Sequence, residues 1–225
     1  MIVLHHLNNS RSQRVLWLLE ELGLAYTIEF HQRQPSLRAP ADLRAIHPLG
    51  KSPVIVDGDN TIAESGAIIE YLVDRYGKGR LVPPPDTEAR LRYTRYTYWL
   101  HYAEGSLMPP LLVELLAGQI AGPQMPWLAR PVARRIAGAL RDRFIDPEIK
   151  LHLDFIEREL EKSLYFCGPD FTAADIQMSF PLEAAAARGG LDPSRPKTWD
   201  WLNRVHARPA YRRALEKGGS YELLR

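Results

Sequence analysis

The segment LGKSPVIVDGDNTIAESGAIIEYL, residues 49–72, carries the pattern that decides the fold. Pro53 stands directly before a short run of β-branched residues, and the DGDN cluster after that run supplies the residue types of a tight turn. Beyond a second short run, an acid and a serine open a stretch with apolar residues at helical spacing. The segment therefore predicts a β-hairpin followed at once by an amphipathic helix.

The residues upstream alternate in the same way. IVLHHL (residues 2–7) is typical of a short buried strand, and AYTIEF (residues 25–30) is rich in the β-branched and aromatic residues of a second strand. Between them, SQRVLWLLEELGL (residues 12–24) has apolar residues at helical spacing, and Gly23 suits a helix C-terminus. The order strand, helix, strand, hairpin, helix predicts a small α/β layer with helices covering one face of its sheet.

The pattern changes at LVPPPDT, residues 81–87, where consecutive prolines favour extended backbone. We expect a domain boundary here, with an α/β domain over residues 1–80 and an all-helical domain over residues 88–225. Asp86 is expected to cap the first long helix of the second domain. Further helices are predicted in the stretches EIKLHLDFIERELEKSL, FTAADIQMSFPLEAAAARGG and WLNRVHARPAYRRALEKG, the last two stretches contributing one each.

Composition limits the classes of function. A net charge of +2 with no lysine-rich block does not indicate nucleic-acid binding. No apolar run reaches the ~20 residues of a membrane span, and the first residues do not resemble a signal peptide, so we expect no membrane insertion. Cys167 is alone, which excludes an internal disulfide and suits a cytoplasmic protein. His5 and His6 have no partner at metal-ligand spacing, so no metal is expected.

Pro53 is the first candidate site residue. A proline at a strand start is often only an edge or turn residue, because it cannot donate to a sheet ladder. The functional interpretation is a cis Ser52–Pro53 bond. That geometry would turn the backbone amide and carbonyl of Ser52 outward, where they can pair with an extended peptide as an added strand.

Glu64 and Ser65 form the second candidate. Ser65 is a standard N-cap residue, and an acid beside a helix N-terminus needs no ligand to explain it. The same physics also suits a ligand, since the free amides and the serine hydroxyl can bind a carboxylate. Glu64 would then face an α-ammonium on the same ligand, and this combination selects a zwitterion over a simple phosphate.

The third candidate is NNSRSQR, residues 8–14, between the first strand and the first helix. Either Ser10 or Ser12 can be the N-cap of a polar loop. The functional interpretation is a set of small hydroxyl and amide groups at a helix N-terminus. Such groups can stabilise a thiolate supplied by a co-substrate.

These motifs together resemble those of the cytosolic glutathione transferases. The resemblance covers nearly the whole chain, and the hairpin-and-helix segment from His47 to Gly77 is its most specific part. The resemblance is supported by three further stretches, SRSQRVLWLLEELGLAY, FTAADI and RPAYRRA. The N-terminal sequence is most similar to that of serine-type bacterial and fungal members. The resemblance implies a thioredoxin-like N-terminal domain followed by an all-helical C-terminal domain, glutathione as co-substrate, and a homodimer.

The resemblance also assigns roles to residues. It implies that Pro53 is cis and that Ser52 pairs with the cysteinyl backbone of glutathione. Glu64 and Ser65 match the acid–serine pair that holds the γ-glutamyl end. Lys51 matches a position whose side chain often reaches the glycyl carboxylate.

The catalytic position stays open among three residues. Counting back from the first helix without a gap places the activating group on Asn9, whereas the motif of the bacterial and fungal members places it on Ser10. Ser12, expected one turn inside the helix, is the third candidate. We favour Ser10; Asn9 as the only sulfur contact would resemble members that reduce disulfides of glutathione.

The electrophile site is expected on the first long helix of the second domain, where Tyr96, Trp99 and Tyr102 are either core residues or pocket residues. MPWLARPVARRIAGALRDRF, residues 125–144, is longer than most members have at this point. Its arginines indicate a cationic amphipathic helix that touches a membrane or a partner, or a solvated helix face beside the electrophile pocket. The latter interpretation is favoured.

The expected function is conjugation of reduced glutathione to small hydrophobic electrophiles. One alternative is a glutathione-dependent disulfide or peroxide reductase on the same fold. The other is a non-catalytic, transferase-like binding module. The binding-module alternative is disfavoured because a scaffold has no use for a zwitterion site, and the chain retains the residues of one, Lys51, Pro53, Glu64 and Ser65.

Overall fold

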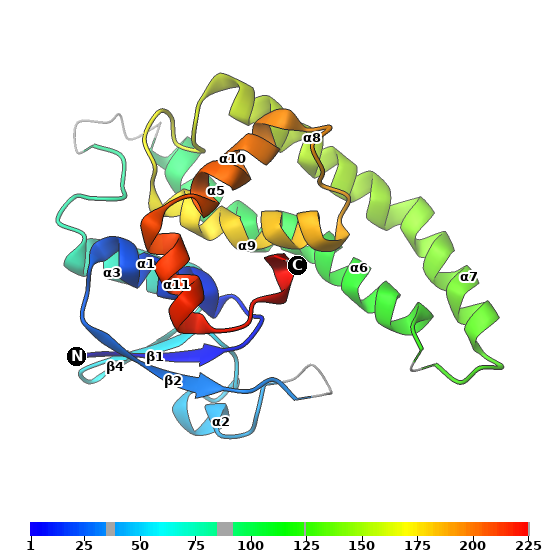
Figure 1. The fold of residues 1–225 in the computed structure, drawn as a ribbon, viewed down its shortest axis with the longest axis horizontal. Coiled ribbons are helices and arrows are strands. Elements are labelled where there is room, and N and C mark those ends of the chain that lie inside the picture. The colour runs from blue at the N-terminus through cyan, green and yellow to red at the C-terminus, as the bar shows by residue number, and fades with distance from the viewer. Residues whose placement is uncertain (35–38, 85–91, 124, 225) are drawn as a thin grey trace.

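A computed structural model describes residues 1–34, 39–84, 92–123 and 125–224. The expected helix cap at Asp86 and the end of the proline-rich boundary, residues 85–87, lie outside these residues. Figure 1 shows a sheet at the bottom of the view, with helices α1 and α3 above it and a larger group of helices beyond them.

Four strands form the sheet, in the order β2-β1-β3-β4. They span β1 (Ile2–Leu7), β2 (Tyr26–His31), β3 (Val54–Asp57) and β4 (Asn60–Ala63). β1 is parallel to β2 and antiparallel to β3, and β3 and β4 form the expected hairpin across the DGDN turn. This is a thioredoxin-like sheet, and the prediction of its elements is confirmed.

Helix α1 (Ser12–Leu22) is buried on almost every side, not only along the apolar stripe that its spacing predicted. It packs against the sheet, against α3 (Ser65–Tyr76) and against two helices of the second part of the chain. Gly23 ends it with a left-handed φ of 66°, as its position predicted. A short helix that the sequence did not indicate, α2 (Leu43–Ile46), precedes β3.

The second part of the chain is helical throughout its described residues. Its elements are the π-helical η1 (Arg92–Thr97), α5 (Tyr98–Tyr102), the π-helical η2 (Ala103–Leu107), α6 (Met108–Ala121), α7 (Arg130–Leu140), the π-helical η3 (Arg141–Ile145), α8 (Asp146–Lys162), α9 (Ala173–Arg188), α10 (Pro196–His206), α11 (Pro209–Gly218) and the 3₁₀ turn η4 (Glu222–Leu224).

The prediction of one helix for WLNRVHARPAYRRALEKG was wrong. The stretch belongs to two helices, α10 and α11, which meet at Arg208 and Pro209. Arg208 is extended, with φ −64° and ψ 133°, because the residue before a proline is disfavoured in the helical region. Pro209 then takes the first position of the new helix, where its missing N–H costs nothing.

A capping box organises the core of the helical part. Thr172 caps α9, and the fully buried Asp175 accepts hydrogen bonds from Thr172 and from the indole N–H of Trp201 on α10. One cluster of buried apolar side chains runs from the sheet through α1 into these helices. The two parts of the chain therefore share a continuous core.

Candidate active site

Strand register brings the three predicted site segments to one end of the sheet. Val54, at the start of β3, pairs with His5 of β1 and with Ala63 of β4. The loop that ends at Pro53 therefore lies beside the exit of β1 and beside the turn from β4 into α3. Residues separated by more than forty positions in sequence meet at this edge.

The loop before β3 has the expected geometry. The Ser52–Pro53 peptide bond is cis. The Ser52 hydroxyl donates to the backbone carbonyl of His5, at 3.2 Å, and lies 3.5 Å from the hydroxyl of Ser10. Lys51 is exposed next to them. The structure thus joins the first and third candidates into one site.

Glu64 and Ser65 stand at the N-terminus of α3, with their helix roles exchanged relative to the prediction. Glu64 is the N-cap, with a left-handed φ of 70°, and Ser65 is the first helical residue. A non-glycine residue in this region carries backbone strain, which proteins retain mainly at functional positions. Glu64 is exposed, whereas the Ser65 hydroxyl is buried and accepts a 3.4 Å hydrogen bond from Gln177 of α9.

The three catalytic candidates occupy different environments. Ser10 is buried in the loop before α1, and its hydroxyl accepts a hydrogen bond from the backbone N–H of Ser12. Ser12 is fully buried and is the first residue of α1, so its expected place one turn inside the helix was wrong. The N-cap is Arg11, which replaces both serines in that role.

Both carbonyl groups of Asn9 are hydrogen-bonded to other parts of the chain. Its side-chain carbonyl accepts the backbone N–H of Glu222, from the C-terminal turn, at 2.8 Å. Its backbone carbonyl accepts from the guanidinium of Arg33 at 3.1 Å. Among the contacts of the described residues, Ser10 is the candidate whose hydroxyl reaches the cis-proline loop, at Ser52.

His6 is a site residue that sequence reasoning assigned only to a strand. Its ring is buried, and Nδ1 lies 2.9 Å from the Ser12 hydroxyl while Nε2 lies 3.1 Å from the backbone carbonyl of Gly218. Burial lowers the pKa of His6 to about 4, with the Gly218 carbonyl opposing the shift and His31 adding to it. The ring is therefore neutral at neutral pH.

The buried ring of His6 predicts a pH-dependent stability. Between about pH 4 and 6.5 the unfolded chain binds a proton that the folded chain does not, so the contribution of His6 falls as the pH falls. Relative to pH 8, about 2 kcal/mol of unfolding free energy is expected to be lost at about pH 5. Urea unfolding of wild type and His6→Asn at both pH values measures this.

The comparison with His6→Asn is necessary because Asp175 changes the unfolding free energy in the opposite direction as the pH falls. Burial raises the pKa of Asp175 to about 6, so in the same range the folded chain binds a proton there that the unfolded chain does not. Subtracting the His6→Asn curve removes the contribution of Asp175. Parallel stability curves for the two proteins would contradict the assignment to His6.

A buried ion cluster ties the site to the helical part. The fully buried Arg14 of α1 pairs with Glu104 of η2, and Arg11 pairs with the other oxygen of the same carboxylate at 2.7 Å. Both guanidinium groups lie over the ring of Phe180 on α9. Burial opposes ionisation of Glu104, but Arg14 and Arg11 hold its pKa below its usual value. Sequence spacing gave no signal for this cluster, because its members are about ninety residues apart.

The expected electrophile pocket residues lie in the core. Tyr96, Trp99 and Tyr102 are at most 6% exposed. Trp99 stacks on Phe155 of α8, and the Tyr102 hydroxyl pairs with His152 of the same helix. Their side chains therefore fill the interior between neighbouring helices, and a role at an electrophile pocket stays a prediction.

The long segment from residue 125 to 144 forms α7 and the turns on either side of it. Figure 1 shows α6 and α7 side by side, running away from the sheet. Arg141 makes a bidentate pair with Glu114 of α6. Large apolar side chains remain exposed on both helices and on the turn between them, namely Leu112, Leu116, Ile120, Trp127, Leu128, Val132, Ile136 and Leu140.

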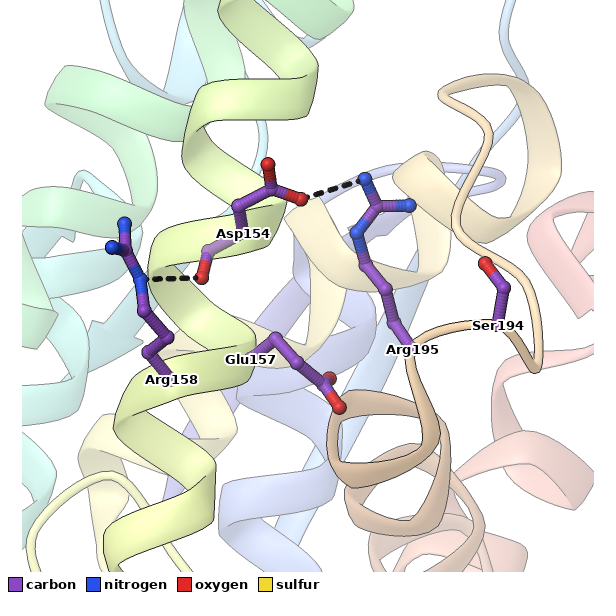
Figure 2. A pocket seen from close by; sticks show the side chains of 5 residues that line it. All are labelled: Asp154, Glu157, Arg158, Ser194 and Arg195. Carbon is purple, nitrogen blue, oxygen red and sulfur yellow. Dashed lines mark hydrogen bonds and ion pairs between the residues drawn. The ribbon is translucent and has the colours of Figure 1, made fainter.

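A separate hollow lies on the helical part, between α8 and the start of α10. Figure 2 shows its lining residues, with Arg195 directed toward Asp154. Arg195 donates to that carboxylate at 3.0 Å, and Glu157 accepts the N–H groups of Lys197 and Thr198 at the beginning of α10. These groups join the two helices, and none of the predicted site residues lies there.

The described residues contain no group of three or more His, Cys, Asp or Glu side chains placed to hold a metal ion. Within the same residues, every helix is too short or too polar to cross a bilayer.

Comparison with known proteins gives consistent matches. The family model for the glutathione S-transferase N-terminal domain matches residues 10–75, and that for the C-terminal domain matches residues 126–213. Glutathione S-transferase 3 of Schizosaccharomyces pombe is 40% identical over 96% of this chain and 88% of its own length. Glutathione S-transferase 1 of Saccharomyces cerevisiae is 33% identical, over 96% of this chain and 95% of its own.

Solved structures agree with these matches. A glutathione S-transferase from Actinobacillus pleuropneumoniae has a TM-score of 0.79 at 32% identity, covering 100% of this chain and 96% of its own. The glutathione transferase URE2P6 from Phanerochaete chrysosporium, solved with oxidised glutathione, has a TM-score of 0.74 at 26% identity and 96% coverage of both chains.

Proposed function

The chain belongs to the glutathione S-transferase family and is a glutathione transferase, and from this premise we propose that it conjugates reduced glutathione to small hydrophobic electrophiles. Ser10 stabilises the reacting thiolate. The observation that carries the proposal is the convergence, at one edge of the sheet, of Ser10, the cis Ser52–Pro53 loop and the start of α3. The chain is closest in type to serine-dependent bacterial and fungal members.

Three groups of this edge hold glutathione in the proposed complex. The backbone of Ser52 pairs with the cysteinyl residue as an added strand. Glu64 binds the α-ammonium of the γ-glutamyl end, while Ser65 and the first N–H groups of α3 bind its carboxylate. Lys51, exposed beside the loop, reaches the glycyl carboxylate.

The energetics suffice without a metal. A thiol with a pKa of ~8.5 is only a few per cent ionised at pH 7, and lowering that pKa by ~2 units requires ~2.7 kcal/mol. A hydrogen bond to a charged group contributes roughly 1.5–3 kcal/mol, and the partial charge of a helix N-terminus adds up to ~1–2. The Ser10 hydroxyl supplies the hydrogen bond, and the first N–H groups of α1, next to it, supply the partial charge.

The quaternary and domain organisation follow from the same proposal. Residues 1–80 bind glutathione, and residues 88–225 contribute the electrophile site. The protein acts as a cytoplasmic homodimer. The exposed apolar side chains of α6 and α7 support a partner subunit, because an apolar patch of this kind is uncommon on a monomer surface.

Calorimetric titration of the purified protein with reduced glutathione tests the proposal. We expect binding in the micromolar to low-millimolar range, followed by conjugation when an electrophilic aromatic halide is added. Failure to bind reduced glutathione would overturn the proposed site. Binding with turnover of disulfides or peroxides, and none of the electrophiles, would instead support the reductase alternative.

A further inference from the structure

A line of three buried side chains runs from the proposed thiolate site into the protein. The Ser10 hydroxyl lies 2.8 Å from the Ser12 hydroxyl, which lies 2.9 Å from Nδ1 of His6. Their exposed fractions are 5%, 0% and 3%, so bulk water does not reach the inner two groups. The line begins at the group that contacts the sulfur and ends at a titratable ring.

The hydrogen bond between His6 and Gly218 fixes the direction of the other hydrogen bonds in this line. Nε2 of His6 contacts the carbonyl of Gly218, which can only accept, so in the neutral ring the proton is on Nε2 and Nδ1 is an acceptor. The Ser12 hydroxyl then has two acceptors within reach, Nδ1 at 2.9 Å and the backbone carbonyl of Leu7 at 3.2 Å, and we assign its proton to the nearer Nδ1. Its oxygen accepts the backbone N–H of Leu7 at 3.2 Å and retains one lone pair, which accepts the proton of Ser10.

The Ser10 oxygen has one position left for a ligand. It accepts the backbone N–H of Ser12, and its own proton is donated to the Ser12 hydroxyl. The nearby Ser52 hydroxyl gives its proton to the carbonyl of His5, so it does not donate to Ser10. One lone pair of Ser10 is thus available to accept the S–H of a bound thiol.

We propose that His6 is the proton acceptor for the glutathione thiol, reached through Ser10 and Ser12. This inference rests on the proposed function, since it takes Ser10 as the group that contacts the sulfur. The thiol proton moves to Ser10, the Ser10 proton to Ser12, and the Ser12 proton to Nδ1 of His6. The products are a thiolate and an imidazolium ring. Each serine hydroxyl now donates its hydrogen bond toward the sulfur instead of toward His6, and no atom is gained or lost.

The reversed line stabilises the product. After the transfer, Nδ1–H donates to Ser12, Ser12 donates to Ser10, and Ser10 donates to the thiolate, so no hydrogen bond is lost. Ser10 contacts the reacting atom and is catalytic, whereas Ser12 acts through it and is a positioning residue. When the thiolate leaves as the conjugate, the same line returns the proton to the site.

The surroundings of His6 keep the ring neutral until a thiolate is bound nearby. The titratable group that faces it from β2 is His31, and the edge of Phe30 packs against it. From α11, the Gly218 carbonyl accepts the hydrogen bond of its Nε2. Burial lowers the pKa of the ring to about 4, which keeps it neutral in the free protein. The charge of a bound thiolate opposes that shift, so protonation is confined to the complex.

The test uses His6→Asn, because the asparagine oxygen can accept the Ser12 proton but cannot bind it covalently. We expect glutathione affinity within about twofold of wild type and a pKa of the bound thiol raised by roughly one unit or more. The ultraviolet absorbance of the thiolate, recorded against pH, measures that pKa, and the pH profile of kcat should shift with it. His152→Asn on α8 is the matched control.

The outcomes separate this inference from the proposed function. A wild-type thiol pKa in His6→Asn, together with a raised one in Ser10→Ala, overturns the role of His6 and leaves the function standing. An unchanged thiol pKa in Ser10→Ala overturns the assignment of the sulfur contact to Ser10 and with it this inference, whereas failure of the wild type to bind glutathione overturns the proposed function. If His6→Asn does not fold, nitrogen NMR of the wild-type ring decides: we expect a neutral ring without glutathione and imidazolium in the thiolate complex. A neutral ring in both states would contradict the proposal.

Discussion

Ser10→Ala is expected to lower kcat by about 10²-fold while leaving the dissociation constant for glutathione nearly unchanged. The alanine removes a hydrogen bond to a charged sulfur, which contributes roughly 1.5–3 kcal/mol, and a loss of that size corresponds to about 10- to 150-fold in rate. Binding is spared because the contacts that hold glutathione belong to the cis-proline loop and to α3. Steady-state kinetics combined with calorimetry measures both quantities.

The neighbouring residue provides the decisive comparison. Asn9 has its side-chain carbonyl bonded to Glu222, so Asn9→Ala is expected to have little effect on turnover. If Asn9→Ala loses activity and Ser10→Ala does not, the alignment without a gap was correct and the thiolate contact is Asn9. Ser194→Ala, in the hollow beside α8, controls for the loss of a hydroxyl elsewhere.

Glu64→Gln is expected to weaken glutathione binding by roughly 30- to 150-fold, with the fold intact. The change keeps the size of the side chain and removes its charge. The charged carboxylate faces the α-ammonium of the ligand in the proposed complex, and an ion-paired hydrogen bond of that kind contributes about 2–3 kcal/mol. Calorimetry gives the affinity, and thermal unfolding verifies that Tm is unchanged.

Glu70 supplies the matched control for this variant. It is an exposed acid on the same helix, α3, without the left-handed backbone of Glu64. Glu70→Gln changes the net charge equally, so it should bind glutathione with wild-type affinity. Equal affinities for wild type and Glu64→Gln would mean that the γ-glutamyl end lies elsewhere.

Local patterns in the sequence predict most of the N-terminal fold. The strands, the hairpin and the helices α1 and α3 follow from residue type and periodicity, which are local properties. The break between α10 and α11 was missed although Pro209 signals it, because the apolar spacing continues across that position. The cis Ser52–Pro53 bond and the place of Glu64 at the start of α3 were also predicted, since their residue types are unusual at those points.

The features that sequence periodicity did not predict share one cause. Periodicity shows that Trp99 and Tyr102 have a buried side, but it does not show whether a helix or a ligand covers that side. Here Phe155 and His152 of α8 cover them. The ion pair of Arg14 with Glu104 was invisible for the same reason, because its members come from helices far apart in the chain.

The sequence by itself determined which residues of this protein are candidates for recognising a zwitterionic peptide and its thiolate. Only the tertiary structure decided which of the two serine hydroxyls lies beside the cis-proline loop. Ser10 and Ser12 are two residues apart and chemically alike. The pairing of β1 with β3 places Ser10 beside Ser52, and the packing of α11 on β1 encloses Ser12 against His6. Access to a ligand depends on what surrounds a side chain, and distant parts of the chain supply those surroundings.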